Sequence, residues 1–264
     1  QFWESGILEH QHGISLLASY HWKNELRVDF RLQWEDFTPV LYSQRYDARV
    51  ESGKVFGWEV TAGQDNHDFL SQTGVREYIS IGGAYPLLDT DYEYLKLEGD
   101  HREYQPFGER SSLIWSVRGG KIWGRYPLQR GFIIGGLQLT NFSALGNLAN
   151  IGALGGVSDT VLRGYRLHQF AGDQFVIGNM ELRSLIWPSS FSQIQNTAVM
   201  ATSFVDAGQV WKNDWALDDE PFISWGVGLK VLVLRGLMLG LDCAFPFNRP
   251  EESCRLHLSI GEVF

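Results

Sequence analysis

The sequence predicts an all-β protein, a transmembrane antiparallel β-barrel of about twelve strands, and three observations support it. Segments that alternate apolar and polar residues recur along the chain, each about 9–15 residues long, enough for a tilted strand to cross an outer membrane. Aromatic residues make up 14% of the 264 residues, including 10 Trp and 10 Tyr, as expected for aromatic girdles at the membrane interfaces. There is no run of about 18 apolar residues, which excludes a transmembrane helix.

The composition also excludes several other classes of protein. The formal net charge of −9 at pH 7 argues against a nucleic-acid partner. The length suits a single domain that covers residues 1–264. The 2 cysteines lack the spacing of a metal site, so we expect no metal and no other cofactor. Because the sequence has neither a Gly-x-Ser-x-Gly elbow nor a His-Glu-x-x-His helix, we do not expect an enzyme.

Seven strands are expected in the first half of the chain. The clearest is 26–34, where Leu26 and Val28 alternate with Arg27 and Asp29. Its charged face suits a water-filled lumen, although a surface hairpin of a soluble sandwich would show the same alternation. The other six predicted strands cover residues 14–22, 40–50, 54–62, 76–85, 92–104 and 113–124.

Five further strands are expected in the second half. The segment 222–234 shows the barrel-wall pattern, because Trp225 and Val227 belong to an apolar series that alternates with small or polar residues. The five predicted strands cover residues 175–187, 197–211, 222–234, 237–247 and 254–264. An even number of strands would place both termini on the periplasmic side. With seven strands before it, the central loop would then open on the extracellular side.

That central loop, from about residue 125 to 171, is the longest stretch without strand character and contains one short motif. Gly155-Gly156 precede Val161-Leu162-Arg163-Gly164-Tyr165. A Gly-rich insertion with one Arg between alternating segments predicts a loop folded into the lumen. An unpaired guanidinium there would be costly, so Arg163 needs acidic partners. Glu181 and Asp206 are carboxylates at predicted lumen-facing positions of the next two strands.

These residues resemble motifs of the BamA-like superfamily of outer-membrane assembly and translocation barrels, the bacterial surface antigen type. The loop resembles the family's Gly-Gly…Leu/Val-Arg-Gly-Tyr/Phe motif. The strand containing Phe204, Asp206 and Gly208 resembles its Phe-x-Asp-x-Gly-x-Val-Trp strand. Gly261 and the terminal Phe264 resemble the sorting signal of outer-membrane barrels. The resemblance covers most of the chain, which is shorter than the best-known members and shows no POTRA domains.

The resemblance implies a bacterial outer-membrane protein that mediates or assists the insertion or translocation of polypeptides. Its partners would be outer-membrane lipids and client polypeptides or partner proteins, in a homo- or hetero-oligomer. Arg163 would fasten the loop to Glu181 and Asp206, and the first and last strands would close the barrel through a weak seam. Two alternatives are a structural or anchoring barrel in an outer-membrane complex and a passive channel. A tethered loop in a narrow lumen argues against the channel.

The two cysteines fall on the outward face of the last two predicted strands. With a connection centred near Asn248-Arg249, Cys243 and Cys254 would lie opposite each other. In an oxidising periplasm this arrangement favours a cross-strand disulfide. The alternative is a pair of free, apolar thiols that face lipid.

Overall fold

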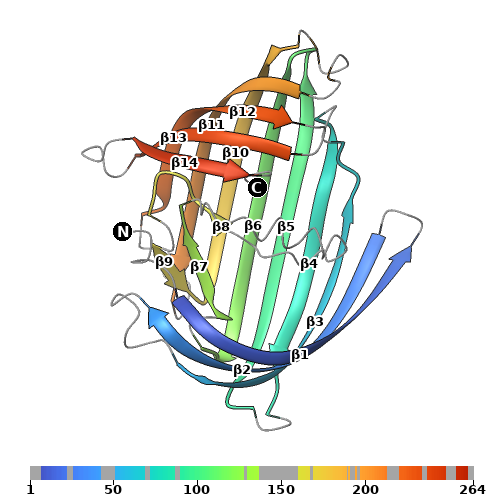
Figure 1. Ribbon diagram of the computed structural model, residues 1–264, viewed down its shortest axis with the longest axis vertical. Helices are drawn as coiled ribbons and strands as arrows, with labels where there is room; N and C mark the ends of the chain where they lie inside the picture. The colour runs from blue at the N-terminus through green and yellow to red at the C-terminus, as the bar shows by residue number, and fades with distance from the viewer. Residues whose placement is uncertain are drawn as a thin grey trace.

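The structure is a computed structural model whose described residues form fourteen β-strands in two sheets, one of eleven strands and one of three, as can be followed in Figure 1. It describes residues 7–22, 26–42, 51–68, 72–86, 90–127, 130–136, 160–166, 169–188, 190, 194, 197–212, 220–233, 237–247 and 254–260. Within these ranges, no helix is long and apolar enough to cross a membrane. The predicted all-β fold is confirmed.

The eleven-stranded main sheet follows the chain in order, and each strand is antiparallel to its neighbours. Figure 1 shows that this sheet is strongly bent. Its strands are β1 (Ile7–Trp22), β2 (Leu26–Tyr42), β3 (Gly53–Asp65), β4 (Gly74–Ala84), β5 (Glu93–Phe107), β6 (Ser111–Arg125), β10 (Gln174–Trp187), β11 (Thr197–Trp211), β12 (Phe222–Val233), β13 (Leu237–Pro246) and β14 (Arg255–Ile260).

Alternation along the strands sorts the side chains of the main sheet onto two faces. In β12, Trp225 and Val227 are 48% and 52% exposed on the outer face, whereas Ser224 and Lys230 are buried on the inner face. Large apolar residues are likewise exposed on the outer face of other strands, as at Met180 in β10. An outer apolar face and an inner face with buried polar groups match the wall of a membrane barrel.

The small sheet lies against the inner face of the main sheet. It consists of β7 (Phe132–Gly135), with β8 (Thr160–Val161) parallel to it on one side and β9 (Phe170–Gly172) antiparallel on the other. Its apolar residues join those of β6 and β10 in one core cluster, Ile122, Phe132, Ile134, Leu162, Tyr165, Phe175 and Ile177. Gly120 allows this contact, because a Cβ there would lie 2.5 Å from the Phe132 ring.

The predicted third strand, residues 40–50, is wrong as a separate strand of the wall. β2 continues to Tyr42 and pairs directly with β3, while residues 43–50 lie outside the described part of the chain. The alternation is misleading here because the polarity of the two faces inverts at the end of β2. Asp36 falls on the outer face, and Phe37 is buried on the inner face against Val55. Among the described residues, six wall strands rather than seven therefore precede the central loop.

The odd number of described wall strands has a geometric consequence. Because each strand reverses the direction of the one before, the first and the eleventh, β1 and β14, run in the same direction. A direct seam between them would therefore be parallel, and no pairing joins them among the described residues. The prediction of an even number with both ends on one side is wrong for these strands. β1 also exposes residues of both faces, such as Ile14 and Leu17.

The outer face can be tested at Val227. We expect Val227→Arg to lower the free energy of unfolding in lipid vesicles by about 2–4 kcal/mol, because it places a charge near the middle of the apolar band. Val227→Leu is the matched control and should leave stability nearly unchanged. Denaturant titration in vesicles measures both variants. An Arg variant as stable as the parent would contradict the outward, lipid-facing assignment.

Candidate functional site

The candidate site forms where the central loop reaches the inner face of the main sheet. The segment that carries Arg163 follows β8, and the Leu162 N–H donates to the Gly135 carbonyl of β7 at 2.7 Å. Gly164 has a φ of +89°, a conformation that favours glycine. A Cβ at Gly164 would also lie 2.9 Å from the Ser224 Cβ. The backbone therefore turns at Gly164 while packed closely against β12.

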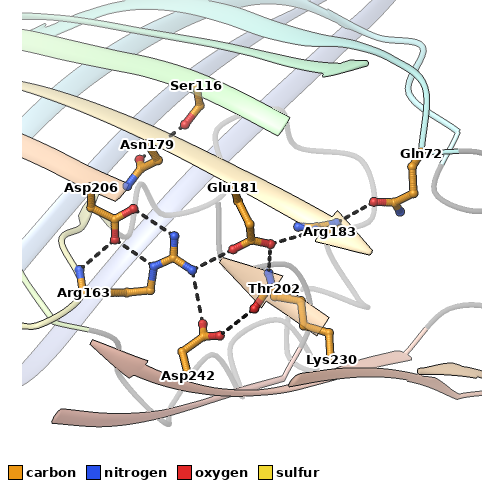
Figure 2. A network of polar contacts seen from close by, with 10 residues as sticks. All are labelled: Gln72, Ser116, Arg163, Asn179, Glu181, Arg183, Thr202, Asp206, Lys230 and Asp242. Atoms are coloured by element: carbon orange, nitrogen blue, oxygen red, sulfur yellow. Dashed lines mark hydrogen bonds and ion pairs between the residues drawn. The ribbon is translucent and has the colours of Figure 1, made fainter. Parts of the chain in front are cut away.

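Arg163 places its guanidinium among three carboxylates from three different strands (Figure 2). Its Nε and Nη2 donate to the two oxygens of Asp206 at 2.7 and 2.8 Å. Its Nη1 donates to Glu181 at 2.7 Å and to Asp242 at 3.2 Å. The guanidinium also lies 3.4 Å from the centre of the Phe204 ring, a cation–π contact. The planar fork of arginine suits this geometry, because it can serve several acceptors at once.

Glu181 extends this cluster toward the end of the sheet that lies opposite the central loop. Its other oxygen accepts hydrogen bonds from Arg183 Nε, at 2.7 Å, and from Lys230 Nζ. Arg183 Nη1 in turn donates to the Gln72 side chain at 2.9 Å. Gln72 belongs to the connection between β3 and β4, which lies at the other end of the antiparallel sheet from the central loop. Figure 2 shows this chain of contacts from Arg163 to Gln72.

The cluster balances its charges in a buried environment. Three carboxylates, Glu181, Asp206 and Asp242, face three cations, Arg163, Arg183 and Lys230. All six side chains are at most 1% exposed. Burial alone would lower the pKa of Arg163, but Asp206 and Glu181 raise it above the ordinary arginine value. The loop arginine therefore stays charged, and every charge in the cluster has an opposite partner.

Residues beside Arg163 attach the loop to the remaining strands. Ser224 of β12 donates its hydroxyl hydrogen to the Arg163 carbonyl. The Gly164 N–H donates to His257 of β14 at 3.0 Å. The Tyr165 hydroxyl donates to the Ile223 carbonyl at 2.9 Å, and the ring packs against Phe170 and Phe222. Together with Glu181, Asp206 and Asp242, these contacts connect one turn of the loop to five consecutive strands, β10 to β14.

The structure brings several of the predicted site residues together. Leu162, Arg163, Gly164 and Tyr165 are all buried in the loop segment. Phe204 lies against Arg163, and Gly208 leaves room for the loop, because a Cβ there would lie 3.5 Å from Leu162 Cδ1 and 3.0 Å from the Ile177 side chain. Gly155, Gly156, Gly261 and Phe264 lie outside the described residues.

Sequence reasoning did not identify five further members of the site. They are Arg183, Ser224, Lys230, Asp242 and His257. Each occupies an inner-face position of its strand, so alternation shows that it points inward. Alternation does not give the register between strands, which decides which inward residues meet.

The cysteine pair lies at the start of the last described strand. Cys243 and Cys254 are joined by a disulfide, with Cα atoms 5.6 Å apart. Cys243 pairs in register with Leu256, and Cys254 lies two residues before it, on the same outer face. Among the described residues, no group of three or more His, Cys, Asp or Glu side chains is placed to hold a metal ion.

Comparison with known proteins gives the following similarities. A sequence model described as the Omp85 superfamily domain matches residues 6–264. The fold is similar to BamA from Haemophilus ducreyi lacking POTRA domains 1-3, with a TM-score of 0.68 and 14% identity over 99% of this chain and 56% of that chain. It is also similar to CdiB from Escherichia coli, with a TM-score of 0.59 and 13% identity over 96% of this chain and 44% of that chain. A third similar structure is CdiB from Acinetobacter baumannii, with a TM-score of 0.57 and 14% identity over 96% of this chain and 41% of that chain.

No curated protein matches the chain. The chain spans 56% of the length of that BamA chain and 44% and 41% of the two CdiB chains. At these identities the structural similarity concerns the fold alone.

The Arg163 contacts can be tested by removing one charge and then its counterpart. Among the described residues, Arg163 supplies all the hydrogen bonds that the Asp206 carboxylate accepts. Arg163→Ala should therefore lower the free energy of unfolding by about 3–5 kcal/mol, because Asp206 becomes an uncompensated buried charge. Asp206→Asn should be milder, since the amide oxygen still accepts a hydrogen bond, and it should partly rescue Arg163→Ala.

Denaturant titration and amide exchange of residues 162–165 measure these effects. Arg31→Ala is the matched control. Arg31 lies on the same inner face but is about one third exposed and pairs with Glu59 at 3.5 Å, so its loss should cost at most about 1 kcal/mol. An Arg163→Ala protein as stable as the control, with unchanged exchange in the loop, would contradict the geometry.

The charge balance of the cluster predicts a second compensation. Lys230→Met removes one of three cations and leaves an excess negative charge beside Glu181, so we expect a loss of about 3–5 kcal/mol in unfolding free energy. Adding Asp242→Asn restores the balance and should recover part of that loss. Unfolding of the single and double variants in vesicles measures the difference. A double variant less stable than Lys230→Met alone would show that net charge is not the controlling factor.

Proposed function

The chain belongs to the Omp85 superfamily of outer-membrane proteins, and on that premise we propose that it mediates or assists the insertion or translocation of polypeptides at the bacterial outer membrane. It acts without enzymatic chemistry, with partner subunits or as an oligomer. The motif resemblance in the sequence points to the same class of activity. The single observation that carries the proposal is the buried attachment of the loop through Arg163.

The chemistry of that attachment argues for a role beyond stability. A buried ion cluster does not by itself make a protein more stable, since well-packed apolar residues of similar volume often stabilise the fold as much or more. It is, however, specific in geometry, because Arg163 fits only where Glu181, Asp206 and Asp242 converge. The attachment links one loop to five consecutive wall strands. A protein that inserts or translocates polypeptides at its wall must control the position of its wall strands, and the loop contacts provide a means to do so. A rigid wall needs no such contacts.

The packing inside the sheet argues against a passive channel. Phe132, Leu162 and Tyr165 fill space next to the inner faces of β6 and β10. A channel needs an open lumen, and small barrels leave little room once a loop is folded inside.

The disulfide between Cys243 and Cys254 favours the anchoring alternative, because it fixes the start of β14 to β13. That covalent link leaves the rest of β14 held by non-covalent contacts.

Reconstitution in vesicles tests the proposal directly. The purified protein would be placed in vesicles of phosphatidylethanolamine and phosphatidylglycerol. An unfolded small outer-membrane barrel would then be added from urea, and its insertion would be followed by protease protection. We expect faster insertion than in vesicles without the protein. Arg163→Ala should reduce that acceleration and Arg31→Ala should not, because Arg163 attaches the loop, whereas Arg31 pairs with Glu59 of a neighbouring strand.

The same vesicles distinguish the alternatives. Ion conductance would be recorded with the parent protein in the absence of client, and the proposal expects it to be low. A steady high conductance would instead identify a passive channel. No acceleration of insertion over empty vesicles, with correctly folded protein, would favour the anchoring alternative and overturn the proposal.

A further inference from the structure

The loop makes one contact with the last described strand that the Arg163 cluster does not include. The Gly164 N–H donates to Nε2 of His257 at 3.0 Å, in the middle of β14. The imidazole is 7% exposed and therefore shielded from bulk water. Because Nε2 accepts this hydrogen bond, the ring is neutral and carries its proton on Nδ1. One hydrogen bond thus joins the residue after Arg163 to β14.

The residues around the His257 imidazole pack closely against its ring. Gly136, directly after β7, lies against the ring, since a Cβ there would be 3.0 Å from His257 Cε1 and 2.2 Å from the Tyr165 carbonyl oxygen. The Gly136 N–H donates to the Arg166 carbonyl at 3.0 Å, which fixes this glycine to the same loop segment. Two glycines from different parts of the loop therefore border the ring of His257.

β14 has few other attachments among the described residues. It pairs only with β13, from Ala244↔Arg255 to Leu239↔Ile260. The disulfide between Cys243 and Cys254 holds its beginning covalently. Toward Ile260, the strand is held by this one-sided backbone pairing and by the contact between His257 and the loop. The loop contact therefore acts on the part of β14 that the disulfide does not secure.

We propose that His257 is a positioning residue that couples the motif loop to the last strand, so that release of Arg163 also loosens β14 from β13. Arg163 and Gly164 are adjacent, so a shift of the arginine out of its three carboxylates also moves the N–H that His257 accepts. The coupling is a property of the folded protein alone. It holds whether or not the protein inserts polypeptides, and its test uses no insertion assay.

The experiment is amide hydrogen exchange, measured by mass spectrometry on the protein in lipid nanodiscs, for peptides that cover residues 162–166 and 256–260. His257→Leu removes the acceptor and should speed exchange in both peptides by roughly two- to tenfold, the effect of one lost buried hydrogen bond. His257→Gln offers a carbonyl oxygen in its place and should return both rates toward those of the parent. Ser259→Ala, on the same strand and face, is the control and should change neither peptide.

A second variant keeps the test decisive if His257→Leu does not fold. Arg163→Ala removes the loop's ion pairs and leaves the sequence of β14 unchanged. If the loop and β14 are coupled, exchange at residues 256–260 should nevertheless become faster. In the double variant with His257→Leu, the effects on β14 should not add, because both remove the same link. Faster exchange of the loop alone in Arg163→Ala would overturn the proposal. So would His257→Leu affecting β14 while the loop stays protected, or His257→Gln behaving like His257→Leu.

Discussion

The structure depends on one buried arginine that needs carboxylates from several strands at once. Arg163 has no exposed surface, and its guanidinium donates hydrogen bonds to Asp206, Glu181 and Asp242, which converge on it from three strands. Removing such a charge from water costs several kcal/mol unless its partners are well placed. The register of β10, β11 and β13 must therefore be correct before the loop can dock. The loop therefore fits only a wall whose strands are paired in this register.

The cluster also explains how two opposite ends of the sheet are connected. Glu181 binds Arg163 with one oxygen and Arg183 and Lys230 with the other, and Arg183 reaches Gln72. Because charges balance across the six residues, they can be buried together although none could be buried alone. A continuous chain of hydrogen bonds and ion pairs therefore runs from the central loop to the β3–β4 connection.

Period-two alternation was sufficient to predict the fold class and the orientation of most strands. It placed Trp225 and Val227 on the outer face and the carboxylates Glu181 and Asp206 on the inner face, while their attachment to Arg163 was what the family resemblance implied. It failed at the end of β2, where residues beyond the apolar band reverse their polarity. Long-range register was not accessible either, so Asp242 and His257 could not be separated from other inward polar residues. These two depend on pairings made only when the last strands assemble.

The central claim is that the Arg163 guanidinium is held by three carboxylates inside the bent sheet. Solid-state NMR of the protein in lipid bilayers, with nitrogen-15 in arginine and carbon-13 in aspartate and glutamate, tests this most directly. Arg163→Lys would assign the guanidinium signals. We predict separate, slowly exchanging signals of its nitrogens, with through-space contacts to the carboxylate carbons of Asp206, Glu181 and Asp242. A single averaged signal with contacts to water alone would contradict the account.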